Sequence, residues 1–490
     1  MGLLHAVPSH RRPVERLATV IGAERYARLR STAAEFRAGF TGRTVWNVNS
    51  TAVGGGVAEI LQALVGYVED LDVAIRWLVI HGDADFFHIT KRLHNAVHGQ
   101  SDGSALGPAE SDHYRRILAA NAEALLELVH PGDVVLLHDP QTAGLAAPLV
   151  EAGAVVVWRS HIGVDDQNET TEAAWEFLRP YVIAAHGWVF SRRGYVPRWL
   201  TGDNLWIIPP SIDPFSAKNQ DLDPGTVRAI LATIGVLDGA AAAPGRFLRP
   251  DGSVGEVART AAVVADSLPG AGDDLVIQVS RWDRLKDMGG VLHGFARHVA
   301  PDRTGYLALV GPSVAGVADD PEGAAVYRDC LAHWRSLPAA VRSRTLLVTL
   351  PLDDTDENAA MVNALQRHAG IVVQKSLAEG FGLTVAEAMW KGRPVIGSAI
   401  GGINDQIAPG TGVLLADPTD LPALGAAIRD LLADHGERTR MGSAAHAYVR
   451  DNFVGDLHLL RYAEVFSTLL AQARDGGRPG QAGSLAGPSR

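Results

Sequence analysis

The sequence predicts an α/β protein with two domains, each built on a parallel sheet that helices cover on both faces. The first observation is the length, because 490 residues exceed what one hydrophobic core usually organises. The second is the composition, 47% hydrophobic and 20% charged, which is typical of a globular chain. The third is a repeated alternation of short, β-branched apolar runs with amphipathic helical patterns.

Charge, cysteine content and hydropathy exclude several classes of function. The net charge of -11 argues against general nucleic-acid binding, although it leaves room for a local basic pocket. Cys330 is the single cysteine, which excludes an intramolecular disulfide and a zinc cluster built from cysteines. The chain shows no secretory leader and no apolar run of about 20 residues, so we expect a cytoplasmic protein without a membrane partner.

The first half of the chain opens with a strand at 44–48, a loop of small residues and an amphipathic helix from Val57. Glycines 54–56 in that loop would let a ligand approach the backbone closely. A dinucleotide fingerprint would need a further glycine where Glu59 stands, so a nicotinamide enzyme is a poor match. The loop is either a phosphate or sugar loop or simply a tight turn between strand and helix.

Further strands are expected in the first half at 74–82, 133–141, 154–163, 188–191 and 205–213. Polar side chains gather at the carboxyl ends of these strands: His81, His138, Asp139, Arg159, His161 and Asp165. Ligands of open parallel sheets sit beyond those ends. One histidine there is more often structural than catalytic, but several polar groups at equivalent ends favour a ligand site.

The second half repeats the alternation, with apolar runs that begin at Leu275, Tyr306, Thr345, Gly370 and Pro394. The segment before it is rich in alanine, glycine and proline, which favours a linker or insertion. The pattern 457–472 is a long amphipathic helix. The expected parts are therefore an amino-terminal domain (1–220), a linker or insertion (221–274), a second domain (275–455), a helix packing back on the first domain (456–474) and a mobile tail (475–490).

A short stretch of the second half combines a strand, a glycine turn and a helix start. Glu379 and Glu387 flank the sequence GFGLTVA, which follows the apolar run GIVVQKS. Such a turn presents backbone N–H groups and the positive end of a helix dipole, which suits a phosphate. The alternative needs no ligand, because Thr384 and Glu387 have the spacing of a capping box.

Two cations follow the first strand of the second half. Arg281 and Lys286 would neutralise a pyrophosphate well, most strongly as charge develops on a leaving diphosphate. They could instead pair with Asp283 and Asp287 on the surface, where such pairs contribute little. The glycines at 401–402 follow another strand and could border the crevice in which these two cations would meet the pyrophosphate.

Taken together, the Arg–Lys pair, the two glutamates around GFGL, the run PVIGSAIGG and the amino-terminal GGG loop resemble retaining glycosyltransferases of family 4, which have the GT-B architecture. The resemblance covers about residues 40–470 and omits the segment near 236–272. It implies two Rossmann-like domains that face a central cleft. Within the family, the sequence is most similar to the trehalose glycosyltransferring synthases, as shown by 81–99, 136–141, 157–162, 208–214 and 379–397. The run HITKRLHN, inside the first of these stretches, is where the subfamily identity would lie.

The resemblance implies that trehalose, an α,α-1,1 disaccharide, forms from a nucleoside diphosphate glucose and glucose, and that the reaction can reverse. Its implied donor-site residues are Gly55, Gly56, Arg281, Lys286, Gly380, Phe381, Gly382, Leu383, Thr384 and Glu387. The implied acceptor-site residues are His81, Asp139, Arg159 and His161. The implied catalytic residues are His161, Arg281, Lys286 and Glu379.

Retention without an evident pair of catalytic carboxylates suggests attack from the face of the leaving group, so we favour this over Glu379 as a nucleophile. No metal and no tightly bound cofactor are expected, and the acidic run 353–357 is interpreted as a helix start. The donor carries UDP, ADP or GDP, and a homodimer is left open. The alternatives are another acceptor (a sugar phosphate, glycerate or an aminocyclitol) and a non-catalytic sugar-nucleotide-binding protein.

Overall fold

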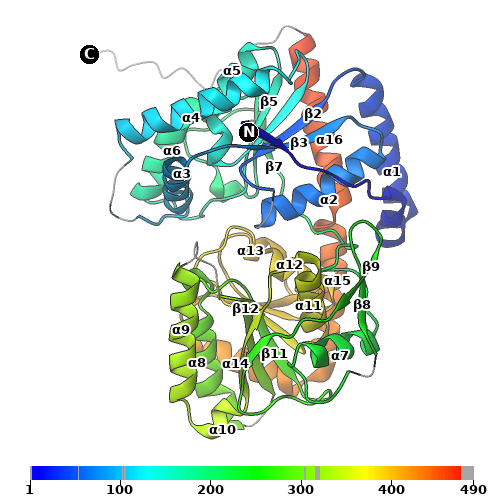
Figure 1. Cartoon of the computed structure of the whole chain (residues 1–490), viewed down its shortest axis with the longest axis vertical. Coiled ribbons are helices and arrows are strands. Elements are labelled where there is room, and N and C mark those ends of the chain that lie inside the picture. Colours follow the sequence, from blue (N-terminus) through cyan, green and yellow to red (C-terminus); the bar gives the residue numbers. More distant parts are fainter. Residues whose placement is uncertain are drawn as a thin grey trace. The chain divides into compact units, whose positions relative to one another are not determined.

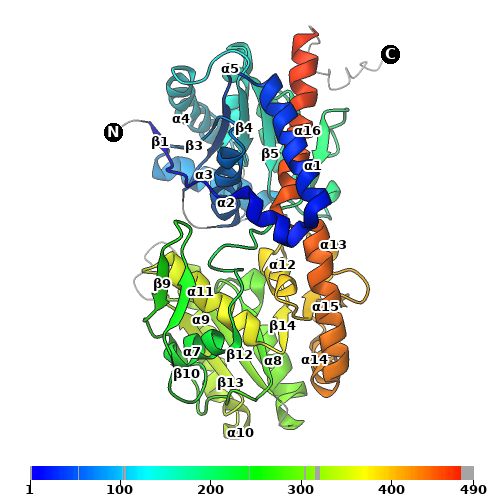
Figure 2. The same ribbon diagram turned by 90° about the vertical axis from the view of Figure 1, so that its right-hand side faces the viewer.

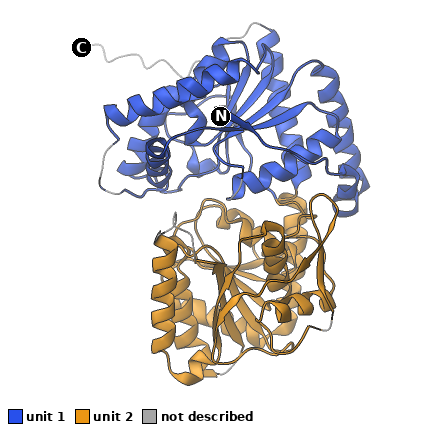
Figure 3. Ribbon diagram, viewed as in Figure 1, with its two compact units in different colours: residues 1–211, 455–490 blue, residues 212–454 orange. Residues whose placement is uncertain are grey.

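The computed structural model of the chain describes residues 3–52, 55–101, 103, 106–241, 243–302, 305–314 and 321–475. The chain divides into two compact units (Figure 3). The first comprises Met1–Ser211 and Gly455–Arg490, and the second comprises Ile212–Val454. Among the described residues, no helix is both long and apolar enough to cross a membrane.

The first unit alternates strands and helices along the chain (Figure 1). Its described elements are β1 (Leu4–Ala6), η1 (Val14–Leu17), α1 (Ala18–Gly39), β2 (Val45–Asn49), α2 (Gly56–Asp70), β3 (Ile75–Ile80), α3 (Ala84–Val97), α4 (Pro108–Leu126), β4 (Val134–His138), η2 (Pro140–Leu145), α5 (Ala146–Glu151), β5 (Val155–Ser160), α6 (Glu169–Val182), β6 (Gly187–Phe190), η3 (Arg193–Tyr195), β7 (Leu205–Ile207) and α16 (Gly455–Arg474).

The sheet of the first unit has the order β1-β3-β2-β4-β5-β6-β7, parallel except for the edge strand β1. Every residue of β4 is buried, and successive side chains point to opposite faces. Val135 and Leu137 join the core under α3 to α6, whereas Val134 and Leu136 join the core under α2 and α16. Helices therefore cover both faces of this sheet.

The second unit repeats the architecture after a short polar segment. Its described elements are α7 (Pro224–Thr233), β8 (Gly245–Leu248), β9 (Val254–Val257), β10 (Ala262–Val264), β11 (Leu275–Val279), η4 (Arg284–Lys286), α8 (Met288–His298), η5 (Ala300–Asp302), β12 (Tyr306–Pro312), α9 (Pro321–Ser336), α10 (Ala339–Arg342), β13 (Thr345–Leu350), α11 (Thr355–His368), β14 (Ile371–Gln374), α12 (Leu383–Trp390), β15 (Val395–Ser398), α13 (Ile403–Gln406), β16 (Gly412–Leu415), α14 (Leu421–Ala433) and α15 (His435–Asn452).

The main sheet of the second unit has the order β10-β13-β12-β11-β14-β15-β16, with β10 as its antiparallel edge. Its central strands β11 to β14 are almost wholly buried apolar runs, as a parallel sheet covered on both faces requires. The prediction of an α/β protein with two parallel-sheet domains is confirmed.

The expected linker at 221–274 carries α7, the hairpin β8–β9 and the edge strand β10, all within the second unit. The helix expected at 456–474 is α16, which belongs to the first unit and lies beside α1 (Figure 2). The expected mobile tail lies, apart from Asp475, outside the described residues.

Candidate active site

The loop that follows β11 carries the two cations expected to bind a diphosphate. Arg281 lies just beyond the carboxyl end of β11, and Lys286 is the last residue of η4. Asp283 organises this loop, since one carboxylate oxygen accepts the Leu285 N–H at 2.8 Å and the other lies 3.1 Å from the Arg281 guanidinium. The Arg281 side chain is 65% exposed, so this pair contributes little to stability and leaves the guanidinium within reach of an anion.

Lys286 lies against Glu379, from the loop that follows β14. Its Nζ is 2.5 Å from Glu379 Oε2, and the Ser376 hydroxyl donates to the same oxygen at 3.2 Å. Both charged side chains are mostly buried, with exposed fractions of 16% and 10%. The alternative partner, Asp287, pairs instead with Lys375. The structure thus brings together two residues that the resemblance implies for the donor site, although they are far apart in sequence.

The ion pair between Lys375 and Asp287 was not predicted. The Lys375 side chain is fully buried directly after β14, and Asp287 caps α8 by accepting the Gly290 N–H at 3.0 Å. Asp287 has a φ of 46°, in the left-handed region, which aspartate tolerates better than most residues. The pair fixes the end of η4 to the carboxyl end of β14 and thereby positions Lys286. A lysine directly after a buried strand is the signal that could have identified it.

Helix α12 begins differently from the capping box that its sequence suggests. Gly382, the residue before the first helical one, has a φ of 81° and a ψ of 62°, and no cap from a side chain is found in the part of the chain that the structure describes. Thr384 lies inside the first turn, where its hydroxyl donates to the Gln374 side-chain oxygen at 3.0 Å. The capping-box interpretation of Thr384 and Glu387 is therefore wrong, because the helix starts at Leu383 and Thr384 is its second residue, not its N-cap. An uncapped helix start leaves its N–H groups to a ligand or solvent.

Glu387 lies one turn further along α12 and is almost completely buried, with an exposed fraction of 2%. Its Oε1 is 3.5 Å from Nζ of Lys218, from the segment before α7. The lysine supplies a counter-charge to this buried carboxylate. Lys218 was not predicted, because nothing in its local sequence marks it as a partner of a residue so distant in the chain.

A second glycine turn packs against the first. The Gly402 N–H donates to the Gly380 carbonyl at 3.1 Å. A Cβ on Gly402 would lie 2.6 Å from the Phe381 Cα, so only glycine permits this approach. The glycines at 401–402 therefore border the turn before α12, as the sequence suggests.

In the first unit, His138, Asp139 and His161 meet at the carboxyl ends of β4 and β5. Nδ1 of His138 lies 2.9 Å from Nε2 of His161, and Nε2 of His138 lies 3.2 Å from the Asn47 amide oxygen. Because the amide oxygen can only accept, His138 donates from Nε2 and His161 donates from Nε2 to His138. This leaves Nδ1 of His161 as an acceptor. Asp139 has a φ of 63°, and its carboxylate accepts a hydrogen bond from the main-chain N–H of His161 at 2.7 Å.

Arg159 is 0% exposed and contacts groups within the protein. Its guanidinium donates to the Tyr462 hydroxyl, lies 3.1 Å from Nε2 of His458 and donates to the Ile208 carbonyl at 3.1 Å. Tyr462 and His458 belong to α16, so the contacts join the end of β5 to the last helix. We therefore propose a supporting role for Arg159, in place of the direct contact with the acceptor that the resemblance implies.

The other residues implied for this unit have simpler surroundings. Gly55 precedes α2 with a φ of 81°, Gly56 is the first residue of α2, and among the described residues no side chain caps this helix start. Gly54 lies outside the described residues. His81 is exposed, and its main-chain N–H and carbonyl bond the Asn121 side chain at 3.0 and 2.8 Å.

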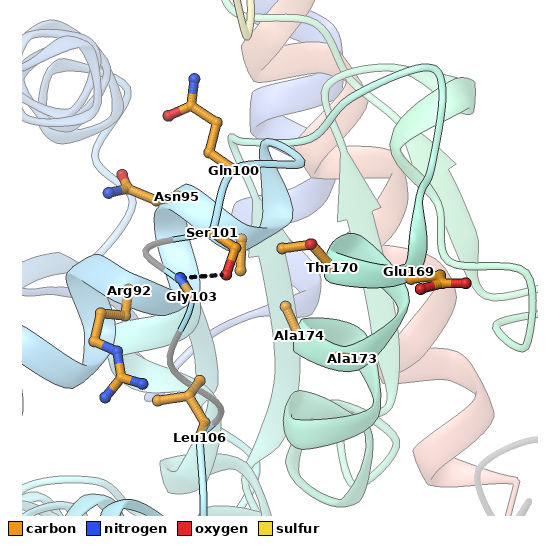
Figure 4. A pocket seen from close by; sticks show the side chains of 11 residues that line it. Arg92, Asn95, Gln100, Ser101, Gly103, Leu106, Glu169, Thr170, Ala173 and Ala174 are labelled. Atoms are coloured by element: carbon orange, nitrogen blue, oxygen red, sulfur yellow. Dashed lines mark hydrogen bonds between the residues drawn. The ribbon is translucent and has the colours of Figure 1, made fainter.

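A hollow of about 530 Å³ lies between the end of α3 and the start of α6 (Figure 4). Arg92 and Asn95, both from the run HITKRLHN, line it together with Gln100 and Ser101 from the following loop and Thr170 from α6. Guanidinium, amide and hydroxyl groups around one hollow suit a ligand rich in hydroxyl groups. The run is thus part of a cavity wall as well as a helix.

The described residues contain no group of three or more histidine, cysteine, aspartate or glutamate side chains arranged to hold a metal ion. In the acidic run 353–357, Asp354 caps α11 and pairs with Arg249 at 2.6 Å. These contacts agree with its interpretation as a helix start.

Two family models match the chain. The model described as "Trehalose synthase, N-terminal domain" matches residues 47–197, and "Glycosyl transferases group 1" matches residues 355–448. The trehalose synthase of Pyrococcus horikoshii is 32% identical over 465 residues, which cover 94% of this chain and 97% of that one. The chain belongs to the trehalose synthase family. The trehalose synthase of Rubrobacter xylanophilus is also 32% identical, over 92% of this chain and 96% of its own.

A solved structure confirms the fold of this trehalose synthase family member. The α,α-trehalose 6-phosphate synthase from Burkholderia multivorans superimposes with a TM-score of 0.65 at 14% identity, covering 90% of this chain and 99% of that one. The predicted GT-B fold is therefore confirmed. The chain is a glycosyltransferase with trehalose-related chemistry.

Burial gives the histidine cluster of this trehalose synthase family member a predictable pH dependence. Burial, aided by the Arg159 charge, lowers the pKa of His138 to about 3 and that of His161 well below its usual value, whereas burial raises the pKa of Asp139 to about 7. Below pH 6.5 the unfolded chain binds protons that the folded histidines do not, so the free energy of unfolding decreases as the pH is lowered. Between pH 7 and pH 5, His138 alone should cost roughly 2 kcal/mol.

Asp139 acts in the opposite direction, because its raised pKa gives stability that is lost as pH rises through about 7. We expect the denaturant midpoint of the native chain to fall from pH 7 to pH 5, because His138 and His161 together outweigh Asp139, and to fall less in His138→Gln. The exposed His5→Gln is the matched control and should keep the native slope. An unchanged slope in His138→Gln would contradict the neutral assignment of His138.

Proposed function

We propose that the enzyme transfers glucose from a nucleoside diphosphate glucose to free glucose and forms trehalose with retention at the anomeric carbon. The observation that carries the proposal is the Lys286–Glu379 pair beside the uncapped start of α12. A cation and a helix dipole directed at one place favour a diphosphate. A carboxylate bonded to the same lysine is suited to a sugar hydroxyl.

The donor would use the residues of the second unit in separate roles. Its pyrophosphate would take the N–H groups of Phe381 to Thr384, with Arg281 and Lys286 as counter-charges. Glu387, held by Lys218 3.5 Å away, would accept hydrogen bonds from the ribose hydroxyls. Glu379 would accept from hydroxyls of the donor glucose, and Gly55 and Gly56 would let that sugar approach the backbone.

In the reaction, the bond between the anomeric carbon and the diphosphate oxygen breaks, and a bond to the acceptor hydroxyl oxygen forms on the same face. The acceptor's proton passes to the departing diphosphate. Arg281 and Lys286 would act most strongly as charge grows on that leaving group. The main-chain carbonyl or the Nδ1 acceptor of His161 would stabilise positive charge near the anomeric carbon, with Asp139 shaping the acceptor side.

A donor–acceptor panel tests this function. The protein is incubated with UDP-, ADP- or GDP-glucose and with glucose, glucose 6-phosphate, glycerate or an aminocyclitol, and the products are read by mass spectrometry. We expect release of a nucleoside diphosphate and a non-reducing disaccharide from free glucose, with the α,α configuration by NMR. Trehalose and the matching nucleoside diphosphate should regenerate the sugar nucleotide.

Three outcomes count against the proposal. A product with a reducing end contradicts the 1,1 linkage, and an inverted anomeric centre contradicts front-face transfer. Product formation only with a phosphorylated or non-sugar acceptor would move the assignment to that acceptor. Incubation without an acceptor is the control, because it measures hydrolysis of the donor alone.

A further inference from the structure

The second unit carries a polar hollow of about 630 Å³ at the opposite edge of its sheet from Arg281 and Lys286. The lining includes Leu275 and Pro394, at the amino ends of β11 and β15, and residues from the end of α11 and the first turns of α15. Arg281 and Lys286 follow the carboxyl end of β11. The hollow is therefore distinct from the proposed donor site.

Three arginines converge on this hollow: Arg367, Arg393 and Arg438. Arg438 pairs with Asp274 at 2.5 Å, and Arg367 pairs with the exposed Asp221 at 2.9 Å. In the part of the chain that the structure describes, Arg393 makes no ion pair. It donates to the Lys391 and Ala369 carbonyls, each at 3.1 Å.

The remaining charged groups of the lining are committed elsewhere. Lys391 is buried, and its Nζ bonds Asn219, Gln366 and the Glu387 carbonyl at 2.9, 2.8 and 3.1 Å. The Asp273 carboxylate accepts the Gly270 N–H at 2.8 Å. Asp221, Asp273 and Asp274 line the same hollow, but among the described residues none forms an ion pair with Arg393.

Burial and two neighbouring positive charges disfavour the charged form of Arg393. Its pKa is lowered, first by burial and then by the positive charges of Arg367 and Arg438. Burial, Arg393 and Arg228 likewise lower the pKa of His368. Among the described residues, Nε of Arg438 and Nε2 of His368 are buried and lack hydrogen-bond partners. Burying a guanidinium without a counter-charge costs free energy that a bound anion would recover.

We propose that this hollow binds a phosphorylated small molecule, with Arg393 as the principal contact to the phosphate. A guanidinium presents parallel donors that match phosphate oxygens, and a second and third arginine add to the attraction. The volume exceeds that of a phosphate alone and accommodates a sugar-sized group. Thr439 and Ser443 line the same wall. Their hydroxyls donate to the His435 and Thr439 carbonyls at 2.9 Å, so they can accept hydrogen bonds from hydroxyl groups of the ligand.

Calorimetric titration of the full chain tests this site with two probes, inorganic phosphate and glucose 6-phosphate. We expect glucose 6-phosphate to bind the native chain and to bind Arg393→Gln at least tenfold more weakly. Lys286→Ala should bind it as the native chain does, since Lys286 lies outside the hollow. Equal affinity for both probes would mean that the site recognises the phosphate alone. Stronger binding of glucose 6-phosphate would mean that other residues of the hollow also contact the sugar.

Ser443→Glu is the second variant, because Ser443 is exposed on α15 and its replacement should not disturb folding. It places a negative charge on the wall of the hollow and should weaken the binding of glucose 6-phosphate as strongly as Arg393→Gln does. Thermal unfolding of each variant verifies that it is folded. The site is overturned if neither probe binds the native chain, or if both variants bind like the native chain. Loss of binding in Lys286→Ala alone would assign the phosphate to the donor site instead.

Discussion

Replacement of Lys286 by alanine should lower kcat about a hundredfold or more, the usual effect of losing one donor to a charged transition state. In the proposed mechanism, the Lys286 ammonium stabilises the leaving diphosphate as its charge grows. The side chain is largely buried against Glu379, so its charge is less screened than an exposed one. Steady-state kinetics with a sugar nucleotide and glucose measures the effect. Arg281→Ala should cause a loss of the same order.

Arg284→Ala is the matched control for Lys286→Ala. Arg284 is an exposed cation in η4, the same short helix, and no role in the site is proposed for it. Its removal should leave kcat within a factor of about two, since isolated surface charges have small effects. Near-native rates in both Lys286→Ala and Arg281→Ala would contradict the placement of the diphosphate. An equal loss in Arg284→Ala would show that charge in general, and not the Lys286 position, is required.

The pattern of strands was predictable because a parallel sheet covered on both faces demands apolar, β-branched runs. β4 and β11 show this in the sequence, and each is buried along its whole length. The glycine turn before α12 was also predictable, because glycine favours the left-handed backbone of Gly382 and is required by the close approach at Gly402. The residues that touch a ligand in the proposed function therefore leave local signals in the sequence.

Other elements leave weaker signals. β1 and β10 are three-residue edge strands, and β8 and β9 form a separate two-stranded hairpin, so none presents an apolar run as long as those of the central strands. The alanine- and glycine-rich segment at 221–274 therefore suggests a linker, although it contains strands. The prediction of a capping box was wrong for a related reason, since the spacing of Thr384 and Glu387 does not reveal where the helix starts.

Long-range partnerships left no local signal. Lys218 beside Glu387, and Tyr462 and His458 around Arg159, come from segments that are remote in sequence. Each partner is a polar residue in an otherwise ordinary loop or amphipathic helix. Their roles depend on which elements meet in space, and the local pattern of a single sequence does not reveal these neighbours.

Replacement of Arg25 by alanine should destabilise the first unit by about 3–5 kcal/mol, because it leaves a buried carboxylate without its counter-charge. Asp456 is 0% exposed in the first turn of α16, where the helix dipole also favours an anion. Nε and Nη2 of Arg25 lie 2.7 to 3.0 Å from its two oxygens. The pair joins α1 to α16, which Phe36 and Phe466 also connect with ring centroids 6.3 Å apart. Thermal and denaturant unfolding measure the loss.

The destabilisation of Arg25→Ala should depend on pH in a defined direction. Burial already raises the pKa of Asp456, and loss of Arg25 removes an interaction that lowers it. A more readily protonated carboxyl escapes the cost of a buried charge, so the difference from the native chain should be largest near pH 8 and shrink toward pH 5. The double variant Arg25→Ala with Asp456→Asn should recover part of the loss at pH 8. The exposed Arg28→Ala on α1 should stay within about 0.5 kcal/mol of the native chain. A loss in Arg25→Ala no larger than that control would show that the pair does not hold α16 in place.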